Sequence, residues 1–282
     1  MTPLDKVRAQ WPGYTPWWIA IGSVAGLLNG AGFLASVFLA NAWSAWLAAD
    51  IAREHGRGQA MRRAWMLIAL GMLCNAARTA YELGFLFAGY TDSSLSPLLG
   101  LRQVPIVASL VAMSIGLHAM WSSFRSLGLG VRLRKLDWAL MAAIILLIPP
   151  VVWSRRVLND ARSPFEIVRY LQFASPILLA IPASMAVVLY RISRELGEGF
   201  MALALRWMAA ALGIRLVALV VATAITASNT SGNPLVIFAH WAFLGALVCR
   251  RRLSLVTTDL VEQYSMSGPA LLATLGWKKI QG

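Results

Sequence analysis

Charged residues are scarce in this chain of 282 residues: they make up 13% of it, and only 12 of them are Asp or Glu. Soluble domains contain about 25% charged residues, so most of this protein's surface must face something other than water. Hydrophobic residues make up 59% of the chain. They form runs of about 20 residues, the length that spans the ~30 Å hydrocarbon core of a bilayer. The composition predicts an integral membrane protein.

Residues that usually bind metals or carry catalysis are also few. Cys74 and Cys249 lie within apolar segments without CxxC spacing, which indicates neither a disulfide framework nor a thiolate metal site. The chain has three histidines, no HExxH motif, no paired-carboxylate motif and no glycine-rich phosphate loop. No lysine lies in the last apolar segment to form a retinal Schiff base. We therefore expect a protein that is not an enzyme and has no cofactor.

Seven apolar segments are long enough to be transmembrane helices. We expect them at 17–40, 64–89, 98–122, 136–153, 165–191, 203–228 and 233–250. The predicted fold class is all-α, a polytopic bundle of about seven helices over 17–250, with an N-terminal segment at 1–16 and a tail at 251–282. Within the tail, Trp277 beside two lysines indicates an interfacial helix at 268–280.

The 25 Lys and Arg residues lie mostly in alternate connections between these segments. Connections rich in Lys and Arg stay in the cytoplasm. The basic ones are 41–63, 123–135, 191–206 and the start of the tail. The N-terminus is thus expected outside and the C-terminus in the cytoplasm, in a bacterial-type inner membrane. The net charge of +13 is explained by this topology and by contact with anionic membrane lipids, and no nucleic-acid partner is expected.

Polar residues within the predicted helices are candidates for a ligand site, because charges at membrane depth are costly and tend to face the bundle interior. The candidates are Asn75, Arg78, Glu82, Arg102, Gln103, Arg169, Tyr170, Gln172, Arg215 and His240. Counting along each helix places nearly all of them in the outer half or the middle, where they could share one cavity.

Arg78 and Glu82 are spaced to pair on one helix face, which predicts either a structural ion pair or part of a binding site. Arg102 and Arg215 remain as spare cations. A small anionic ligand such as an organic acid, a lipid head group or a quinone-like molecule would suit them. The alternative is that outer arginines extend to lipid phosphates, which applies best to Arg102 and Arg169 and poorly to Arg215.

Small residues mark one face of the first predicted helix, where Gly22, Gly26 and Gly30 recur every four residues. Such a stripe lets another helix approach closely, and packing within the bundle is favoured over dimerisation. A separate pattern, WMxxALG, occurs at 65–71 and at 207–213. It indicates either a parallel 3+1+3 duplication or a chance match in a chain rich in Ala and Leu.

The stretches 63–71, 81–83, 136–140 and 206–208 resemble the seven-helix sensory modules that precede diguanylate cyclase or histidine kinase domains in bacteria. The resemblance implies an outward-facing ligand pocket whose occupancy is passed to a cytoplasmic output domain. No GGDEF-like or kinase segment follows the last predicted helix in this sequence. The output is therefore expected to come from a protein partner.

Three functions agree with these patterns. The first is ligand sensing and signalling, with an outward-facing, arginine-rich pocket for a small anion. The second is a scaffold or a lipid- or quinone-contacting subunit of a larger membrane complex, and the third is transport of a small solute. Membrane lipids and a protein partner or a second copy of the chain are the expected partners.

Overall fold

The structure is a computed structural model that describes residues 24, 30–56, 58–88, 101–126, 133–159, 166–197, 200–225 and 234–264. Across these residues it contains seven α-helices and no strand. The helices are α3 (Gly30–Arg53), α4 (Ala60–Phe87), α6 (Gln103–Ser126), α7 (Lys135–Asn159), α8 (Glu166–Glu195), α9 (Phe200–Ile225) and α10 (Pro234–Tyr264).

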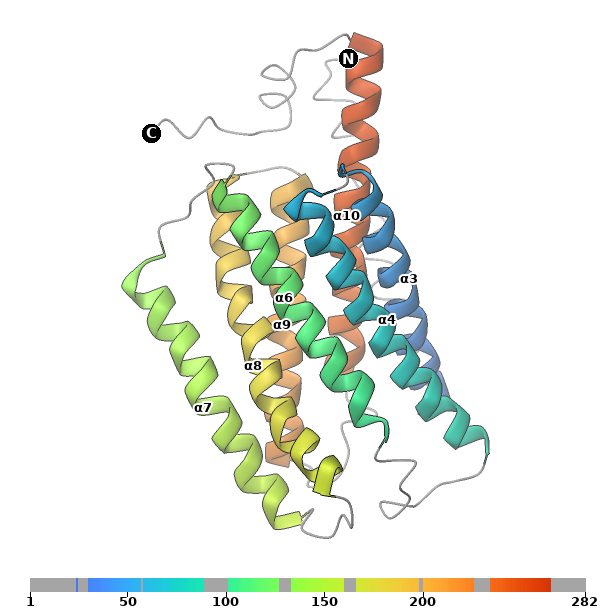
Figure 1. The fold of residues 1–282 in the computed structure, drawn as a ribbon, viewed down its shortest axis with the longest axis vertical. Coiled ribbons are helices and arrows are strands. Elements are labelled where there is room, and N and C mark those ends of the chain that lie inside the picture. The colour runs from blue at the N-terminus through green and yellow to red at the C-terminus, as the bar shows by residue number, and fades with distance from the viewer. Residues whose placement is uncertain are drawn as a thin grey trace.

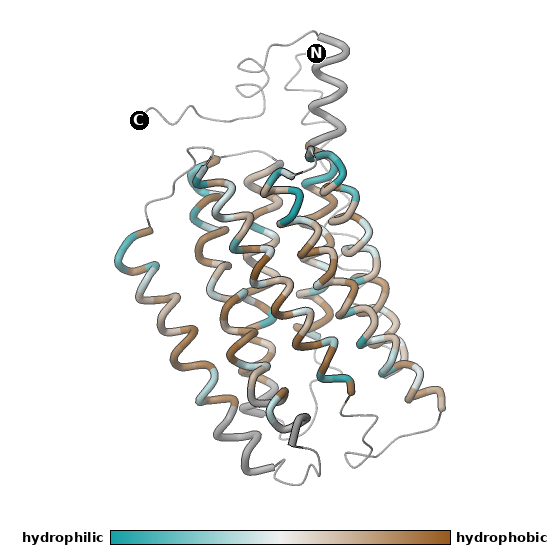
Figure 2. Tube along the Cα trace, viewed as in Figure 1, coloured by the Kyte–Doolittle hydropathy of each residue, from teal (hydrophilic) through white to brown (hydrophobic). Residues whose placement is uncertain are grey.

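Six of these helices are long and apolar enough to cross a membrane, which confirms the predicted multi-pass helical architecture in the part of the chain described. The helix outside that set is α4, which carries Asn75, Arg78 and Glu82. Large apolar side chains such as Leu73, Leu146 and Leu147 lie exposed on the outside of the bundle, where lipid covers them. Figure 2 shows apolar residues recurring along the coloured parts of the helices.

Six helices form a closed ring in the order α3, α4, α6, α8, α9 and α10, and α10 packs back against α3. The buried indole of Trp241 closes the ring by donating a hydrogen bond to Ser36 Oγ at 2.8 Å. α7 lies outside the ring against α8 and the edge of α9 (Figure 1). Its first turn is fixed by Asp137, which accepts a 2.9 Å hydrogen bond from Arg191 Nε of α8.

The end of the first described helix differs from the predicted end at 40, because α3 (Gly30–Arg53) continues to Arg53. The predicted connection 41–63 is largely helical, and a short turn between α3 and α4 replaces it. The polar residues that suggested a loop are accommodated inside the helix. Asn41 Nδ2 donates to the Val37 carbonyl at 2.7 Å, and Asp50 forms an ion pair with Arg251.

The last helix also exceeds its prediction, because α10 continues from the predicted end at 250 to Tyr264. It extends beyond the other helices at one end of the bundle (Figure 1). We call this end the basic end, since it carries Arg62, Arg63, Arg125, Arg191 and Arg250. The predicted N-terminal segment 1–16 and interfacial helix 268–280 lie outside the described residues.

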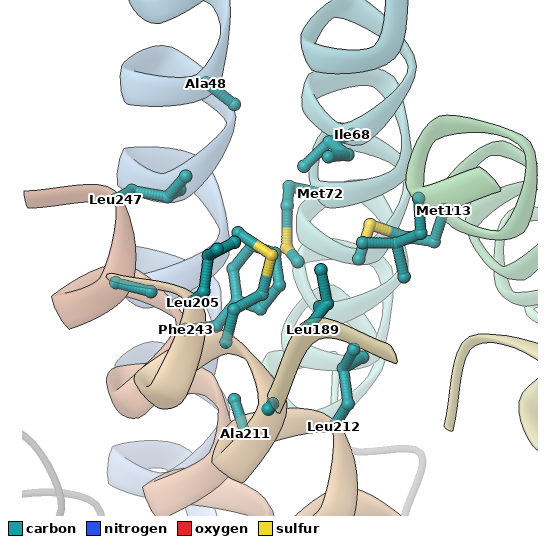
Figure 3. Packing of buried hydrophobic residues seen from close by; sticks show 14 of the residues in the cluster. Ala48, Ile68, Met72, Met113, Leu189, Leu205, Ala211, Leu212, Phe243 and Leu247 are labelled. Atoms are coloured by element: carbon teal, nitrogen blue, oxygen red, sulfur yellow. The ribbon is translucent and has the colours of Figure 1, made fainter. Parts of the chain in front are cut away.

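The interior of the ring is apolar towards the basic end. On α4 the core residues run from Ala64 to Met72, and on α9 they run from Ala202 to Leu212. Figure 3 shows side chains of α4, α8, α9 and α10 meeting at the centre of the ring. The polar residues of α4 and α9 come after these core segments, so they lie in the half of the bundle away from the basic end.

Two glycines bring α4 and α6 together. A Cβ on Gly71 would lie 2.7 Å from Met113 Cγ, and one on Gly116 would lie 3.0 Å from the Ala64 carbonyl oxygen. By contrast, no described atom lies within 4 Å of a Cβ built on Gly30. Gly22 and Gly26 lie outside the described residues, so a packing role for that stripe remains a prediction.

The ring arranges the helices as two triplets in head-to-tail contact, α3-α4-α6 and α8-α9-α10, with α7 between them in sequence. A 3+1+3 duplication would give this pattern of neighbours. The two WMxxALG segments nevertheless differ in environment, because Met66 is 48% exposed whereas its counterpart Met208 is 1% exposed. The duplication remains a prediction.

Candidate functional site

One face of α4 carries the first part of the site. Asn75, Arg78 and Glu82 follow at helical spacing, and they lie beyond the last core residue of α4. Arg78 Nε donates a 3.0 Å hydrogen bond to Glu82 Oε1, and both side chains are partly buried. The predicted pairing of these two residues is therefore present.

Two further residues of the predicted set come from other helices. The positive charge of Arg215 of α9 is within electrostatic range of Arg78, and the two repel each other. His240 of α10 is within range of both arginines, which oppose a positive charge on it. His240 is buried and Arg215 is partly buried. We group the residues that this electrostatic range connects, together with Asn75 and Glu82 of α4, as the interior cluster: Asn75, Arg78, Glu82, Arg215 and His240.

The charges of the interior cluster do not balance. It contains two arginines and one carboxylate, and the Arg78–Glu82 pair uses that carboxylate. Arg215 takes part in none of the ion pairs that the described residues form. In a medium of low dielectric constant, such a surplus positive charge attracts an anion strongly.

An unpaired hydrogen-bond donor lies in the same cluster. Asn75 is 2% exposed, and its amide Nδ2 is buried without a partner among the described residues. Leaving a buried donor unpaired is costly by about 1–3 kcal/mol. The interior cluster therefore offers a surplus cation and a free donor, which together suit an anion with hydrogen-bond acceptors.

The remaining predicted residues are placed differently. Gln103 is buried at the start of α6, and Arg102 is partly buried just before it. No contact joins either of them to the interior cluster within the described residues. Tyr170 is 69% exposed on the outside of α8, so it does not line the interior as expected. The side chains of Arg169 and Gln172 lie outside the described residues.

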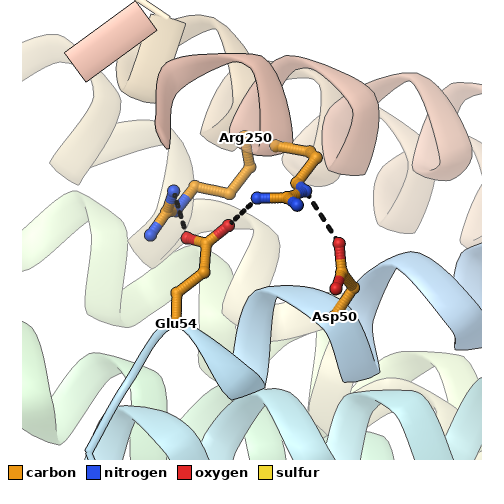
Figure 4. Close-up of polar contacts among 4 residues, drawn as sticks. Asp50, Glu54 and Arg250 are labelled. Carbon is orange, nitrogen blue, oxygen red and sulfur yellow. Dashed lines mark hydrogen bonds and ion pairs between the residues drawn. The ribbon is translucent and has the colours of Figure 1, made fainter. Parts of the chain in front are cut away.

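A second group of charges, which sequence reasoning missed, joins α3 to α10 at the basic end (Figure 4). We call Asp50, Glu54, Arg250 and Arg251 the basic-end cluster. Arg251 Nε lies 2.7 Å from Asp50 Oδ2, and Arg251 Nη1 lies 2.6 Å from Glu54 Oε1. Arg250 Nη1 lies 3.5 Å from Glu54 Oε2. The i, i+4 spacing of the two acids was the available signal, but the predicted loop at 41–63 concealed it.

His55 follows this cluster in the turn after α3. Burial lowers the pKa of His55 below its usual 6.5, Arg250 lowers it further, and Glu54 acts in the opposite direction. Its Nε2 atom is buried without a hydrogen-bond partner among the described residues.

Neither cluster has the composition of a metal site. Within the described ranges, no group of three His, Cys, Asp or Glu side chains converges as metal ligands would. The chemistry that the interior cluster offers is electrostatic binding and hydrogen bonding. Comparison of the chain with protein-family models, with curated proteins and with solved structures gives no match.

Proposed function

We propose that this membrane protein senses a small anion, which binds at the interior cluster. The observation that carries the proposal is the surplus charge of Arg215, which is within electrostatic range of Arg78 and takes part in none of the ion pairs of the described structure. A planar guanidinium binds carboxylate or phosphate with two parallel hydrogen bonds. Asn75 Nδ2 would supply a further donor.

The charge pattern of the chain supports an outward-facing site. The basic end would lie in the cytoplasm of a bacterial-type inner membrane, because Lys and Arg favour cytoplasmic positions. The interior cluster lies in the opposite half of the bundle, which would then open towards the outside. This is the arrangement that the resemblance to sensory modules implies.

α10 could transmit the effect of ligand binding to the cytoplasmic side, because it extends from the interior cluster to the basic end. It carries His240 at the interior cluster and Arg250 and Arg251 at the basic end, and it continues to Tyr264. The ten residues from His240 to Arg250 correspond to about 15 Å of helix. An anion that favours one position of α10 would shift the population of that position, and a protein partner at the basic end would detect the change.

Transport is the second candidate, and the head-to-tail contact of the two triplets favours it. A transported anion needs a polar route through the full depth of the bundle. The core fills the basic half of the ring with apolar side chains such as Ile68, Leu205 and Leu247. This filling favours a binding site over a transport path.

The test is thermal unfolding of the protein, purified in mild detergent, with a panel of anions that includes chloride, phosphate, acetate and succinate. We expect at least one carboxylate or phosphate to raise the Tm by several degrees, and we expect Arg215→Met to remove that shift. Arg194→Met is the matched control, because Arg194 is exposed and lies at the basic end. Equal shifts in all three proteins, or no shift in any, would overturn the proposal.

Reconstituted vesicles separate the two candidates. An anion that stabilises the protein but is not taken up by vesicles containing it supports sensing. Uptake that requires Arg215 would replace sensing by transport.

A further inference from the structure

An open apolar groove of about 440 Å³ runs along the outer face of α6 between α4 and α8. Val104 and Ile115 lie at its two ends on α6, with Ala108 between them, while α4 contributes Leu67 and Leu70 and α8 contributes Leu171. Every lining side chain is apolar. The groove is distinct from the interior cluster, because Leu70, Val104 and Ile115 are exposed on the outside of the bundle.

The length of the groove matches one leaflet of a bilayer. Val104 and Ile115 are eleven positions apart, which corresponds to about 16 Å of helix. Half of a ~30 Å hydrocarbon core is about 15 Å. The groove begins near one end of the bundle and ends near mid-membrane, as the site of a single lipid tail would.

Two polar residues lie close in sequence to the lining residues at the outer end of the groove, at the level of lipid head groups. Arg102 lies two residues before Val104, is partly buried, and forms no ion pair within the described structure. Tyr170 precedes Leu171 and is largely exposed. A cation and a tyrosine at this level are typical contacts of lipid phosphates at the membrane interface.

From the length, the apolar wall and the charged mouth, we infer that the groove between α4, α6 and α8 binds one anionic phospholipid. One acyl chain lies along Ala108, and the phosphate meets Arg102. With the basic end in the cytoplasm, this lipid belongs to the outer leaflet. The inference does not depend on the anion site, because the two sets of residues do not overlap.

Native mass spectrometry of the protein from mild detergent, with equal amounts of phosphatidylglycerol and phosphatidylcholine added, tests this inference. We expect the wild-type protein to retain phosphatidylglycerol in preference. Ala108→Phe fills the groove and should reduce retention of both lipids about tenfold, a loss equivalent to about 1.4 kcal/mol. Ala142→Phe is the control, since Ala142 is also exposed but lies on α7. Val111→Phe, at another groove position, serves if Ala108→Phe does not fold.

The head-group contact has its own pair of variants. Arg102→Gln should remove the preference for phosphatidylglycerol while leaving phosphatidylcholine bound, and Arg102→Lys should keep it. Equal lipid loss in Ala108→Phe and Ala142→Phe would overturn the site, and so would an unchanged preference in Arg102→Gln. A change of oligomeric mass in Ala108→Phe without lipid loss would assign the groove to a second copy of the chain instead.

Discussion

The interior cluster and the basic-end cluster are both built from arginine and carboxylate side chains, but their charges are balanced differently. At the basic end, two acids meet two arginines in three ion pairs of 2.6 to 3.5 Å. The interior cluster has two arginines and one glutamate, which forms a single ion pair of 3.0 Å with Arg78. The first group can neutralise itself, whereas the second keeps a surplus positive charge.

This difference favours a structural role for the basic-end cluster and the proposed binding role for the interior cluster. A balanced group of partly exposed charges holds two helices in register, and removing one member leaves another uncompensated. A surplus charge at membrane depth has no such structural benefit, and it persists where a ligand or a proton pathway requires it. Since α10 belongs to both clusters, it connects the proposed binding site to the contact between α3 and α10.

Glu54→Gln is the change expected to have the largest effect on stability. It removes the carboxylate that both Arg250 and Arg251 contact. We expect the free energy of unfolding to fall by about 2–3 kcal/mol, between the values for surface and buried pairs. Unfolding in mixed micelles with increasing SDS measures it. Glu195→Gln, at an exposed position of α8, should change it little. Equal effects in the two variants would mean that the basic-end cluster does not hold α3 to α10.

Gly71→Ala tests the close packing of α4 against α6, because α4 carries three residues of the interior cluster. The new Cβ would lie 2.7 Å from Met113 Cγ and 3.1 Å from the Ser109 carbonyl oxygen, so α4 and α6 must separate slightly. We expect a loss of about 1–2 kcal/mol in the same unfolding assay. Gly84→Ala is the matched control on α4, because no described atom lies near its added Cβ. It should be neutral or stabilise by up to ~1 kcal/mol, owing to the higher helix propensity of alanine. A milder effect at Gly71 than at Gly84 would contradict the close packing.

Glu82→Gln sharpens the comparison by increasing the charge imbalance of the interior cluster. The variant frees Arg78, so two arginines face the ligand instead of one. We expect the affinity for the stabilising anion to rise about tenfold, or 1.4 kcal/mol. Titration calorimetry in detergent measures the change in Kd. An unchanged or weaker Kd would mean that Glu82 contacts the ligand or that the anion binds elsewhere.

Local properties of the sequence predicted the helical bundle. Hydropathy and loop charge are properties of single segments, so they located the helices. The i, i+4 rule located the Arg78–Glu82 pair. The predicted end of the first helix at 40 was wrong, because Asn41 and Asp50 are compatible with either a loop or a helix. Their contacts in the folded bundle favour the helix.

The features that could not be predicted depend on residues that are distant in sequence and meet only in the folded bundle. No local sequence pattern identifies such neighbours. The partner of Glu54 lies 197 residues further along the chain, at Arg251. The close contact of α4 with α6 uses Gly71 and Gly116 rather than a stripe of repeated glycines. Tyr170 was expected inside because polar residues at membrane depth tend to face the bundle interior, but the rotation of α8 in the bundle places it outside.

The smallest expected effect concerns pH at the basic end. Because burial and Arg250 lower the pKa of His55 below 6.5, the unfolded chain binds more protons than the folded chain just below that pH. Stability therefore rises with pH in this window and falls as the solution is acidified through it. We expect a shift from pH 7.5 to 5.5 to lower the Tm of the wild-type protein more than that of His55→Gln.

The anion-dependent shift in Tm should change equally in both proteins, because His55 lies far from Arg215 along the bundle. If acid lowers the Tm of the two proteins equally, protonation of His55 does not contribute to the loss of stability. The pH dependence would then arise from the carboxylates of the basic-end cluster.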